Sequence, residues 1–326
     1  MSRLSDYLEI LIPTYNRKPH ITRTLTQLTA PESPVRTCSI TVLDNASEDG
    51  SSEAIAQFAA KFPNVKHVRH AKNIGGNANI ARAFEMARAE YVWVLCDDDK
   101  YDFSNWKECE HALATHPAAV VVANYIHPQN GPAYLFRQLS FVPAAIYRTD
   151  LITSTTLMNM YCNIVNMFPQ LALAAAAFNS KDPMPILSQP LVTMQLNSNN
   201  DSYTRGSQTT SKIHPTLREM NWMKGYLPSI SMLENSDIRT QCCFCAQSED
   251  ECFYNYCGRF MEKGSSLLYT YIYGIHFHNK WAKLAFTLLA PLALTCSFFC
   301  DEKGINIRLF GKIKVRIWKF LKSKSS

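Results

Sequence analysis

Three consecutive aspartates, Asp97, Asp98 and Asp99, follow a short apolar run at residues 91–95. Removing carboxylates from water without a counter-charge is very costly, so these side chains must face solvent or a cation. An apolar strand that ends in carboxylates places them at the carboxyl edge of a sheet, where open α/β sheets bind ligands. Carboxylate oxygens suit Mg²⁺ or Mn²⁺, which often bridge one or two carboxylates to substrate phosphates. The triplet therefore indicates a divalent-metal site, with a simple acidic turn as the alternative.

Alternating strands and helices are expected to position this triplet. Apolar runs typical of strands occur at residues 8–12, 40–43, 65–70, 91–95 and 120–123. Between the first four, apolar residues recur with helical spacing, as at Ile21, Leu25 and Leu28. This alternation predicts an α/β fold with a doubly wound, mostly parallel sheet.

Polar loops follow three of these strands, at residues 14–17, 44–50 and 97–99, and in such a sheet the loops share one edge. Together with a glycine-containing loop at 72–77, they carry the groups that a nucleoside diphosphate requires. An aromatic ring can stack on a base, a carboxylate can accept a hydrogen bond from a base N–H, glycines allow close approach, and basic side chains meet phosphates. The residues concerned are Tyr15, Asp44, Gly75, Gly76, Arg17 and Lys72.

Four motifs in these loops resemble those of family 2 glycosyltransferases with the GT-A fold. They are Pro13-Thr14-Tyr15-Asn16-Arg17, Asp44-Asn45-Ala46-Ser47-Glu48-Asp49-Gly50, Asn73-Ile74-Gly75-Gly76-Asn77 and Asp97-Asp98-Asp99. Each motif alone is weakly specific, but all four appear in the family's order and at its usual spacing. The resemblance covers about residues 6–125 and implies a GT-A-type sheet, the nucleotide-diphospho-sugar transferase fold. The pattern of the later residues separately predicts a mainly helical C-terminal extension.

The resemblance also implies a nucleotide-sugar donor and a Mn²⁺ or Mg²⁺ cofactor. In the family, the positions of Tyr15 and Asp44 hold the nucleobase, and the acidic motif holds the ribose and the metal. The family motif is usually Asp-x-Asp, and Cys96 occupies its first acidic position in one register. The metal-binding pair therefore stays open, with Asp99 preferred and Asp97 or Asp98 next. The implied donor-binding residues are Pro13, Thr14, Tyr15, Arg17, Asp44, Asn45, Asn73, Gly75, Asn77, Asp97 and Asp98, and the implied metal ligands are Asp99 and Asp97.

The acceptor half departs from the family pattern at Pro169 and Gln170. Inverting members usually carry an acidic pair there, whose aspartate takes the proton of the acceptor hydroxyl. A glutamine cannot act as a general base. The base and the stereochemical outcome therefore stay unassigned, and the candidates by residue type alone are Asp150, Asp182, His214 and Glu219.

The pattern of the chain changes after about residue 126. Residues 134–147 are expected to form one or two strands, and residues 151–178 helix interrupted by Pro169. We therefore expect four regions. They are a nucleotide-sugar-binding half at 1–125, an acceptor-binding half at 126–215, a helical extension at 216–280, and an apolar segment with a basic amphipathic, membrane-associating tail at 281–326.

The net charge of +6 is concentrated in the tail, because residues 303–326 carry eight basic residues and no acid. Without those eight charges the rest of the chain is at −2, which argues against nucleic acid as a partner. Residues 284–300 are uncharged and lie at the lower limit of length for spanning a bilayer. This segment and the tail predict attachment to an anionic membrane surface, with a buried helix as the alternative.

The expected function is transfer of a sugar from a nucleotide-diphosphate-sugar donor to a saccharide or lipid-linked acceptor in cell-surface polysaccharide synthesis. A signal-peptide pattern is absent from the first residues, so we expect a cytoplasmic protein, peripheral on the inner face of the membrane, and in that compartment we expect its cysteines to be reduced thiols. One alternative is a catalytically impaired nucleotide-sugar-binding module. Another is a nucleotidyltransferase, which should carry a basic, glycine-rich loop where residues 14–17 stand.

Overall fold

The computed structural model describes residues 7–123, 131–164, 168–193, 226 and 228–245. The chain divides into two compact units, Met1–Ile213 with Asn221–Cys245, and His214–Met220 with Ala246–Ser326. All described residues belong to the first unit, and the expected apolar segment and basic tail at 281–326 lie outside them. Within the described ranges, no helix combines the length and the apolar character needed to cross a membrane.

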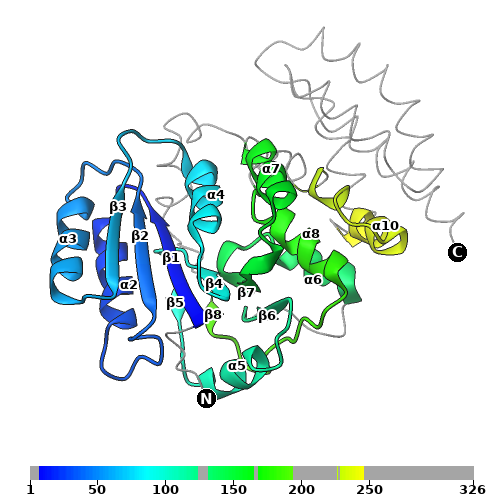
Figure 1. Cartoon of the computed structure of the whole chain (residues 1–326), viewed down its shortest axis with the longest axis horizontal. Coiled ribbons are helices and arrows are strands. Elements are labelled where there is room, and N and C mark those ends of the chain that lie inside the picture. Colours follow the sequence, from blue (N-terminus) through cyan, green and yellow to red (C-terminus); the bar gives the residue numbers. More distant parts are fainter. Residues whose placement is uncertain (1–6, 124–130, 165–167, 194–225, 227, 246–326) are drawn as a thin grey trace, which may run out of the picture. The chain divides into compact units, whose positions relative to one another are not determined.

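A mixed sheet of six strands forms the centre of this unit (Figure 1). Its strand order is β3 (Val65–Arg69), β2 (Ser39–Asp44), β1 (Leu8–Thr14), β4 (Tyr91–Val94), β7 (Ala145–Arg148) and β6 (Ala119–Val121). The first four strands are parallel, whereas β7 is antiparallel to both β4 and β6. The prediction of a doubly wound, mostly parallel sheet is therefore confirmed, and residues from both sides of position 126 contribute to it.

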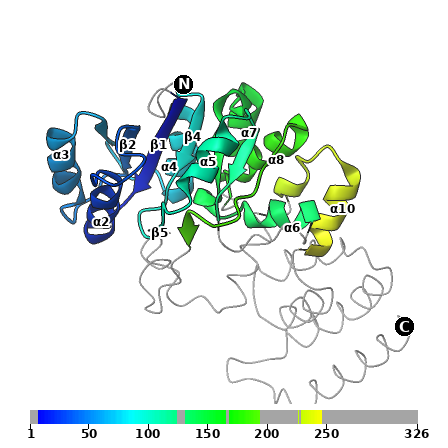
Figure 2. The same ribbon diagram turned by 90° about the horizontal axis from the view of Figure 1, so that it is seen from below.

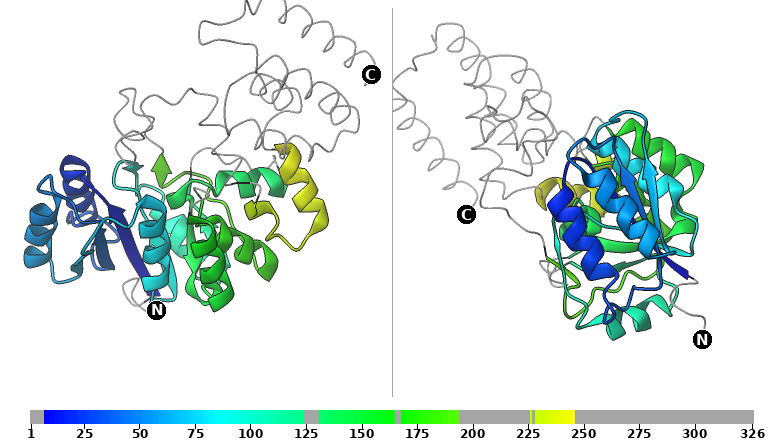
Figure 3. Two further views of the ribbon diagram at one scale, coloured as in Figure 1. Left: turned by 90° about the horizontal axis from the view of Figure 1, so that it is seen from above. Right: turned by 90° about the vertical axis from the view of Figure 1, so that its left-hand side faces the viewer.

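Helices cover both faces of the parallel half. The connections through α2 (Lys18–Leu28) and α3 (Ser51–Lys61) step from β1 to β2 to β3, and these two helices pack side by side. The connection through α4 (Gly76–Met86) returns across β2 and β1 to β4. Because such crossovers are right-handed, this reversal places α4 on the opposite face, as Figure 3 shows.

The strand order reverses between β1 and β4, which makes their carboxyl ends the topological switch point of the sheet. The loop after β1 and the aspartate triplet after β4 both lie there. Beneath them, the largest buried side chains include Trp93 and Tyr91 of β4 and Tyr147 of β7. A rigid apolar layer therefore supports a polar edge.

Residues 134–147 were expected to be strand, and this is only partly right. Residues Gly131–Gln138 form α6, and only Ala145–Arg148 are strand. The buried positions Ala133, Phe136 and Leu139 recur every three residues, a spacing that fits a helix face better than the twofold period of a strand. The ring of Phe136 packs at 5.6 Å from that of Phe178.

The expected break in the helix at Pro169 is confirmed, because α7 (Ser154–Cys162) and α8 (Leu171–Ser180) are separate, neighbouring helices (Figure 2). A small second sheet pairs β5 (Lys100–Tyr101) with β8 (Val192–Thr193), and its two-residue strands are too short to give a pattern in the sequence. The remaining elements are α5 (Trp106–Leu113), the 3₁₀ turns η2 (Val142–Ala144) and η3 (Thr149–Leu151), and α10 (Ser236–Cys245).

Candidate active site

The loop after β1 is fastened to the loop after β2. The backbone N–H of Asn16 donates to Ser47 Oγ at 2.9 Å, and the Asn16 side-chain oxygen accepts from the N–H of Glu48 at 2.8 Å. One residue on, the Arg17 N–H donates to Ser51 Oγ at 3.1 Å. These bonds hold the half-buried Tyr15 beside the turn that begins with Asp44.

The loop after β2 is in turn fastened to the glycine-containing loop before α4. The buried Asn45 donates from Nδ2 to Asn73 Oδ1 at 2.8 Å and accepts the N–H of Ile74 at 2.9 Å. Gly75 has φ +89°, which disfavours any residue with a Cβ, and open space surrounds the position of that missing atom. Asn77 donates from Nδ2 to the carbonyl of Ile164 at 2.7 Å, so this loop also contacts the segment after α7.

The loop after β1 meets the aspartate triplet directly. Thr14 Oγ1 donates to Asp97 Oδ2 at 2.5 Å. The Arg17 guanidinium lies 3.1 Å from Asp97 Oδ1 and also pairs with Asp98. Burial raises the pKa of Asp97 to about 6, against the opposing effects of the Arg17 charge and the Thr14 hydrogen bond. Arg17, which was expected to meet phosphate, is therefore paired with two carboxylates of the triplet, Asp97 and Asp98, in the protein alone.

Asp44 ends β2 and is completely buried. Its Oδ1 accepts the backbone N–H of Ser47 at 2.9 Å and so closes the turn. Its Oδ2 lies 3.6 Å from both His67 Nε2 and Arg69 Nε, two residues of β3. Sequence reasoning missed both basic neighbours, although Arg69 is directly opposite Asp44 in the strand register. Alternate residues of a strand share a face. Once the register places Arg69 opposite Asp44, His67 is therefore expected on the same face of β3, near the same carboxylate.

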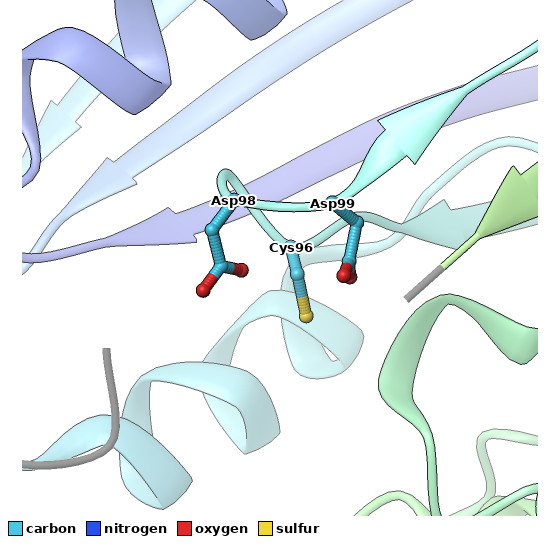
Figure 4. A group of neighbouring side chains, drawn as sticks. All are labelled: Cys96, Asp98 and Asp99. Atoms are coloured by element: carbon cyan, nitrogen blue, oxygen red, sulfur yellow. The ribbon is translucent and has the colours of Figure 1, made fainter. Parts of the chain in front are cut away.

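Cys96, Asp98 and Asp99 form a group that could hold a metal ion, and their ligand atoms all lie within 4.8 Å of one another. Figure 4 shows the three side chains pointing the same way from the loop between β4 and β5. Within the described part of the chain, no other group of three histidine, cysteine, aspartate or glutamate side chains brings its ligand atoms so close together. Asp99, the preferred ligand from the sequence, belongs to it. Asp97, its expected partner, does not, because its carboxylate is turned towards Thr14 and Arg17.

The structure places two of the candidate bases away from the aspartate triplet. Arg148 pairs with Asp150 at 2.8 Å and with Asp182 at 2.7 Å. In the antiparallel register of β4 and β7, Arg148 stands opposite Tyr91, the first residue of β4. Asp150 and Asp182 are therefore held at the amino end of β4, at the other edge of the sheet from the triplet. His214 and Glu219 lie outside the described residues.

Comparisons with known proteins agree with this arrangement. The family model of glycosyl transferase family 2 matches residues 9–174. Abequosyltransferase RfbV of Salmonella typhimurium is 31% identical over 94 residues, which is 28% of each chain. The first 349 residues of Staphylococcus aureus TarS, solved in complex with UDP, align at a TM-score of 0.55 and 14% identity over 89% of this chain and 86% of that one.

A second solved structure has the same fold. It is the mannosyltransferase PcManGT of Pyrobaculum calidifontis in complex with GDP-Man and Mn²⁺, with a TM-score of 0.52, 14% identity, and coverage of 88% of this chain and 80% of that one. The chain matches less than half of the length of the curated relatives, 28% for RfbV and 39% for a dolichyl-phosphate β-glucosyltransferase of Trichomonas vaginalis.

Proposed function

The chain belongs to glycosyltransferase family 2, and from that premise we propose that it transfers a sugar from a nucleotide-diphosphate-sugar donor to a saccharide or lipid-linked acceptor. The observation that carries the proposal is the convergence of four loops at the switch point of the sheet. The bonds Asn16–Ser47, Asn45–Asn73 and Thr14–Asp97 connect these loops in series.

In this proposal the nucleotide lies across the four loops. Tyr15 stacks on the base, Asp44 accepts a base N–H, and residues 73–77 line the nucleotide. The convergence of the Asp98 and Asp99 carboxylates with Cys96 fits a divalent ion that takes its other ligands from the donor. Mn²⁺ or Mg²⁺ bound there would stabilise the charge that develops on the leaving diphosphate.

Arg17 has two alternative partners in this scheme. Burial lowers the pKa of Arg17, but the charges of Asp97 and Asp98 outweigh it, so the pKa is raised and the guanidinium stays charged. A divalent ion at the carboxylates would compete with Arg17 for them. The donor diphosphate would offer the released guanidinium a second set of oxygens to bind.

The direct test is a panel of UDP-, GDP-, CDP- and dTDP-sugars, incubated with purified protein and Mn²⁺ or Mg²⁺ without acceptor. We expect one base to support slow release of nucleoside diphosphate by hydrolysis. Binding without any release would favour the impaired module. In a parallel incubation of nucleoside triphosphates with sugar 1-phosphates, attack of the sugar phosphate on the α-phosphorus with release of inorganic pyrophosphate would favour a nucleotidyltransferase.

Asp44→Asn should weaken donor binding more than it slows the chemical step. The amide keeps an oxygen for the Ser47 N–H but removes the charge that faces His67 and Arg69. We expect about a tenfold loss of donor affinity, which is the order of one charge-assisted hydrogen bond. The kcat should stay within about twofold, because the nucleobase lies far from the reacting carbon. The matched control is Asp49→Asn in the same loop, whose carboxylate accepts from Lys18 and Ser51. A lower kcat at unchanged donor affinity would contradict the proposal that Asp44 binds the nucleobase.

The attachment of the protein to a membrane is proposed from the sequence alone. A lipid-linked acceptor would give the apolar segment at 284–300 and the basic tail a function, by holding the protein on the inner face of the membrane. We expect deletion of residues 282–326 to move the protein from the membrane fraction to the soluble fraction. High salt should release the full-length chain only in part, because apolar burial is insensitive to screening. Full-length protein that is wholly soluble at low salt would contradict this location.

A further inference from the structure

Cys96 directly precedes the aspartate triplet and follows the buried Leu95 at the end of β4. Its Sγ lies within 4.8 Å of a carboxylate oxygen of Asp98 and of one of Asp99. Figure 4 shows the sulfur pointing between these two carboxylates. The donor set of this group is therefore one sulfur and two oxygens, whereas the usual aspartate motif of the family supplies oxygen alone.

The backbone that carries this sulfur is held in place by two hydroxyl groups. The hydroxyl of the buried Tyr101 donates to the carbonyl of Cys96 at 2.7 Å. From helix α2, Thr24 Oγ1 donates to the carbonyl of Asp97 at 2.9 Å. The carbonyls of two consecutive residues are thus anchored, and the thiol of Cys96 projects from a fixed turn.

The spacing of the group fits a single divalent ion. Zn²⁺ binds thiolate sulfur at about 2.3 Å and carboxylate oxygen at about 2.1 Å, so a sulfur and an oxygen on one ion are at most about 4.4 Å apart. The ligand atoms of Cys96, Asp98 and Asp99 lie within 4.8 Å of one another. Small rotations of the side chains are therefore enough to bring them onto one ion.

The sulfur changes which ions the group should prefer. Thiolates are soft ligands that suit Zn²⁺ and, to a lesser degree, Co²⁺, whereas Mg²⁺ prefers oxygen. Burial, together with the charges of the three aspartates, raises the pKa of Cys96 well above its usual value, so the thiol carries its proton while no ion is bound. A bound cation reverses this balance, because a coordinating thiol gives up its proton, here to solvent.

We propose that Cys96 is a ligand of the donor-site metal, together with Asp98 and Asp99, and that its sulfur makes the site favour Zn²⁺ and Co²⁺ over Mg²⁺. This inference rests on the proposed function, because it assigns the metal of that function to a mixed site of sulfur and oxygen. The cysteine at the first acidic position of the family motif therefore changes the metal preference and does not abolish the site.

Co²⁺ reports this sulfur directly, because a thiolate, the form of cysteine that binds metals, gives a charge-transfer absorption band with Co²⁺ in the near ultraviolet. The test is titration of the full-length chain with Co²⁺, alone and with UDP, GDP, CDP and dTDP in turn. We expect the band in the wild-type chain and in Cys162→Ser, a control that removes an exposed cysteine of α7. Cys96→Ser and Cys96→Asp, which both lack the sulfur, should lose it.

Calorimetric titration with Co²⁺ and Mg²⁺ measures the preference itself. In Cys96→Ser, the ratio of the Co²⁺ to the Mg²⁺ association constant should fall at least about tenfold, since even changes outside the ligand shell cost that much at metal sites. Cys96→Asp supplies oxygen ligands only, so the same ratio should fall while Mg²⁺ binds at least as tightly as in the wild-type chain. A merely structural role of Cys96 would weaken both ions alike and leave the ratio unchanged.

Three results would overturn the role of Cys96 and leave the proposed function standing. They are a wild-type chain that binds Co²⁺ without the band, a band that survives Cys96→Ser, and an unchanged ratio in Cys96→Asp. A wild-type chain that binds neither ion, even with a nucleoside diphosphate present, would overturn this role together with the metal of the proposed function. Absence of nucleotide release from every donor would instead overturn the proposed transfer reaction.

Discussion

Asp99→Ala is expected to reduce turnover to below about a thousandth of the wild-type rate, because it removes a carboxylate from the group that would hold the metal. The fold should survive the change. Asp98 and Asp99 are like charges in the same small group, so removing one relieves repulsion. The measurement is release of nucleoside diphosphate, together with unfolding followed by circular dichroism.

A binding measurement makes this expectation independent of activity. For the wild-type chain, Mn²⁺ at ten times its dissociation constant should stabilise the fold by about 1.4 kcal/mol, and Asp99→Ala should lose that shift. The control is Asp102→Asn, an exposed position in the same segment whose side chain accepts the N–H of Ser104. Undiminished turnover and an undiminished Mn²⁺ shift in Asp99→Ala would show that the metal binds elsewhere or is not needed.

The gathering of the loops was predictable from the sequence, whereas the roles within the triplet were not. Parallel strands that end in polar residues must deliver those residues to one edge, so Thr14, Asp44 and Asp97 follow from the alternation of apolar runs alone. Which side chain faces which neighbour depends on the backbone of a tight turn. That turn directs Asp97 to Thr14 and Arg17 and gathers Cys96, Asp98 and Asp99 into the candidate metal group, in which Asp98 also pairs with Arg17.

The misplaced base candidates have a different cause. Asp150 and Asp182 were chosen by residue type, and residue type carries no information about position in the fold. The antiparallel direction of β7, which the sequence did not reveal, carries Arg148 and both carboxylates away from the site.

Arg17→Met should cost about 3 kcal/mol in the free energy of unfolding, at the lower end for breaking a buried ion pair. The side chain of Asp97 is only 5% exposed, and without Arg17 its charge and that of Asp98 lose their cation. Arg17 itself is 24% exposed, which is why the lower end applies. Urea unfolding at neutral pH measures the loss. The control is Arg82→Met, which breaks the exposed pair with Glu85 and should cost less than about 0.5 kcal/mol.

A double-mutant cycle with Asp97→Asn decides whether the ion pair is the cause. The asparagine keeps an oxygen for the Thr14 hydroxyl but carries no charge, so the loss caused by Arg17→Met should shrink to about 1 kcal/mol in its presence. The remainder reflects Asp98 and the packing of the arginine stem. Additive losses would mean that Arg17 stabilises the site through Asp98 and packing, and not through Asp97. In either case a metal ion at Asp98 has the Arg17 pair to displace, so Arg17→Met should raise the apparent affinity for Mn²⁺, and an unchanged affinity would contradict this competition.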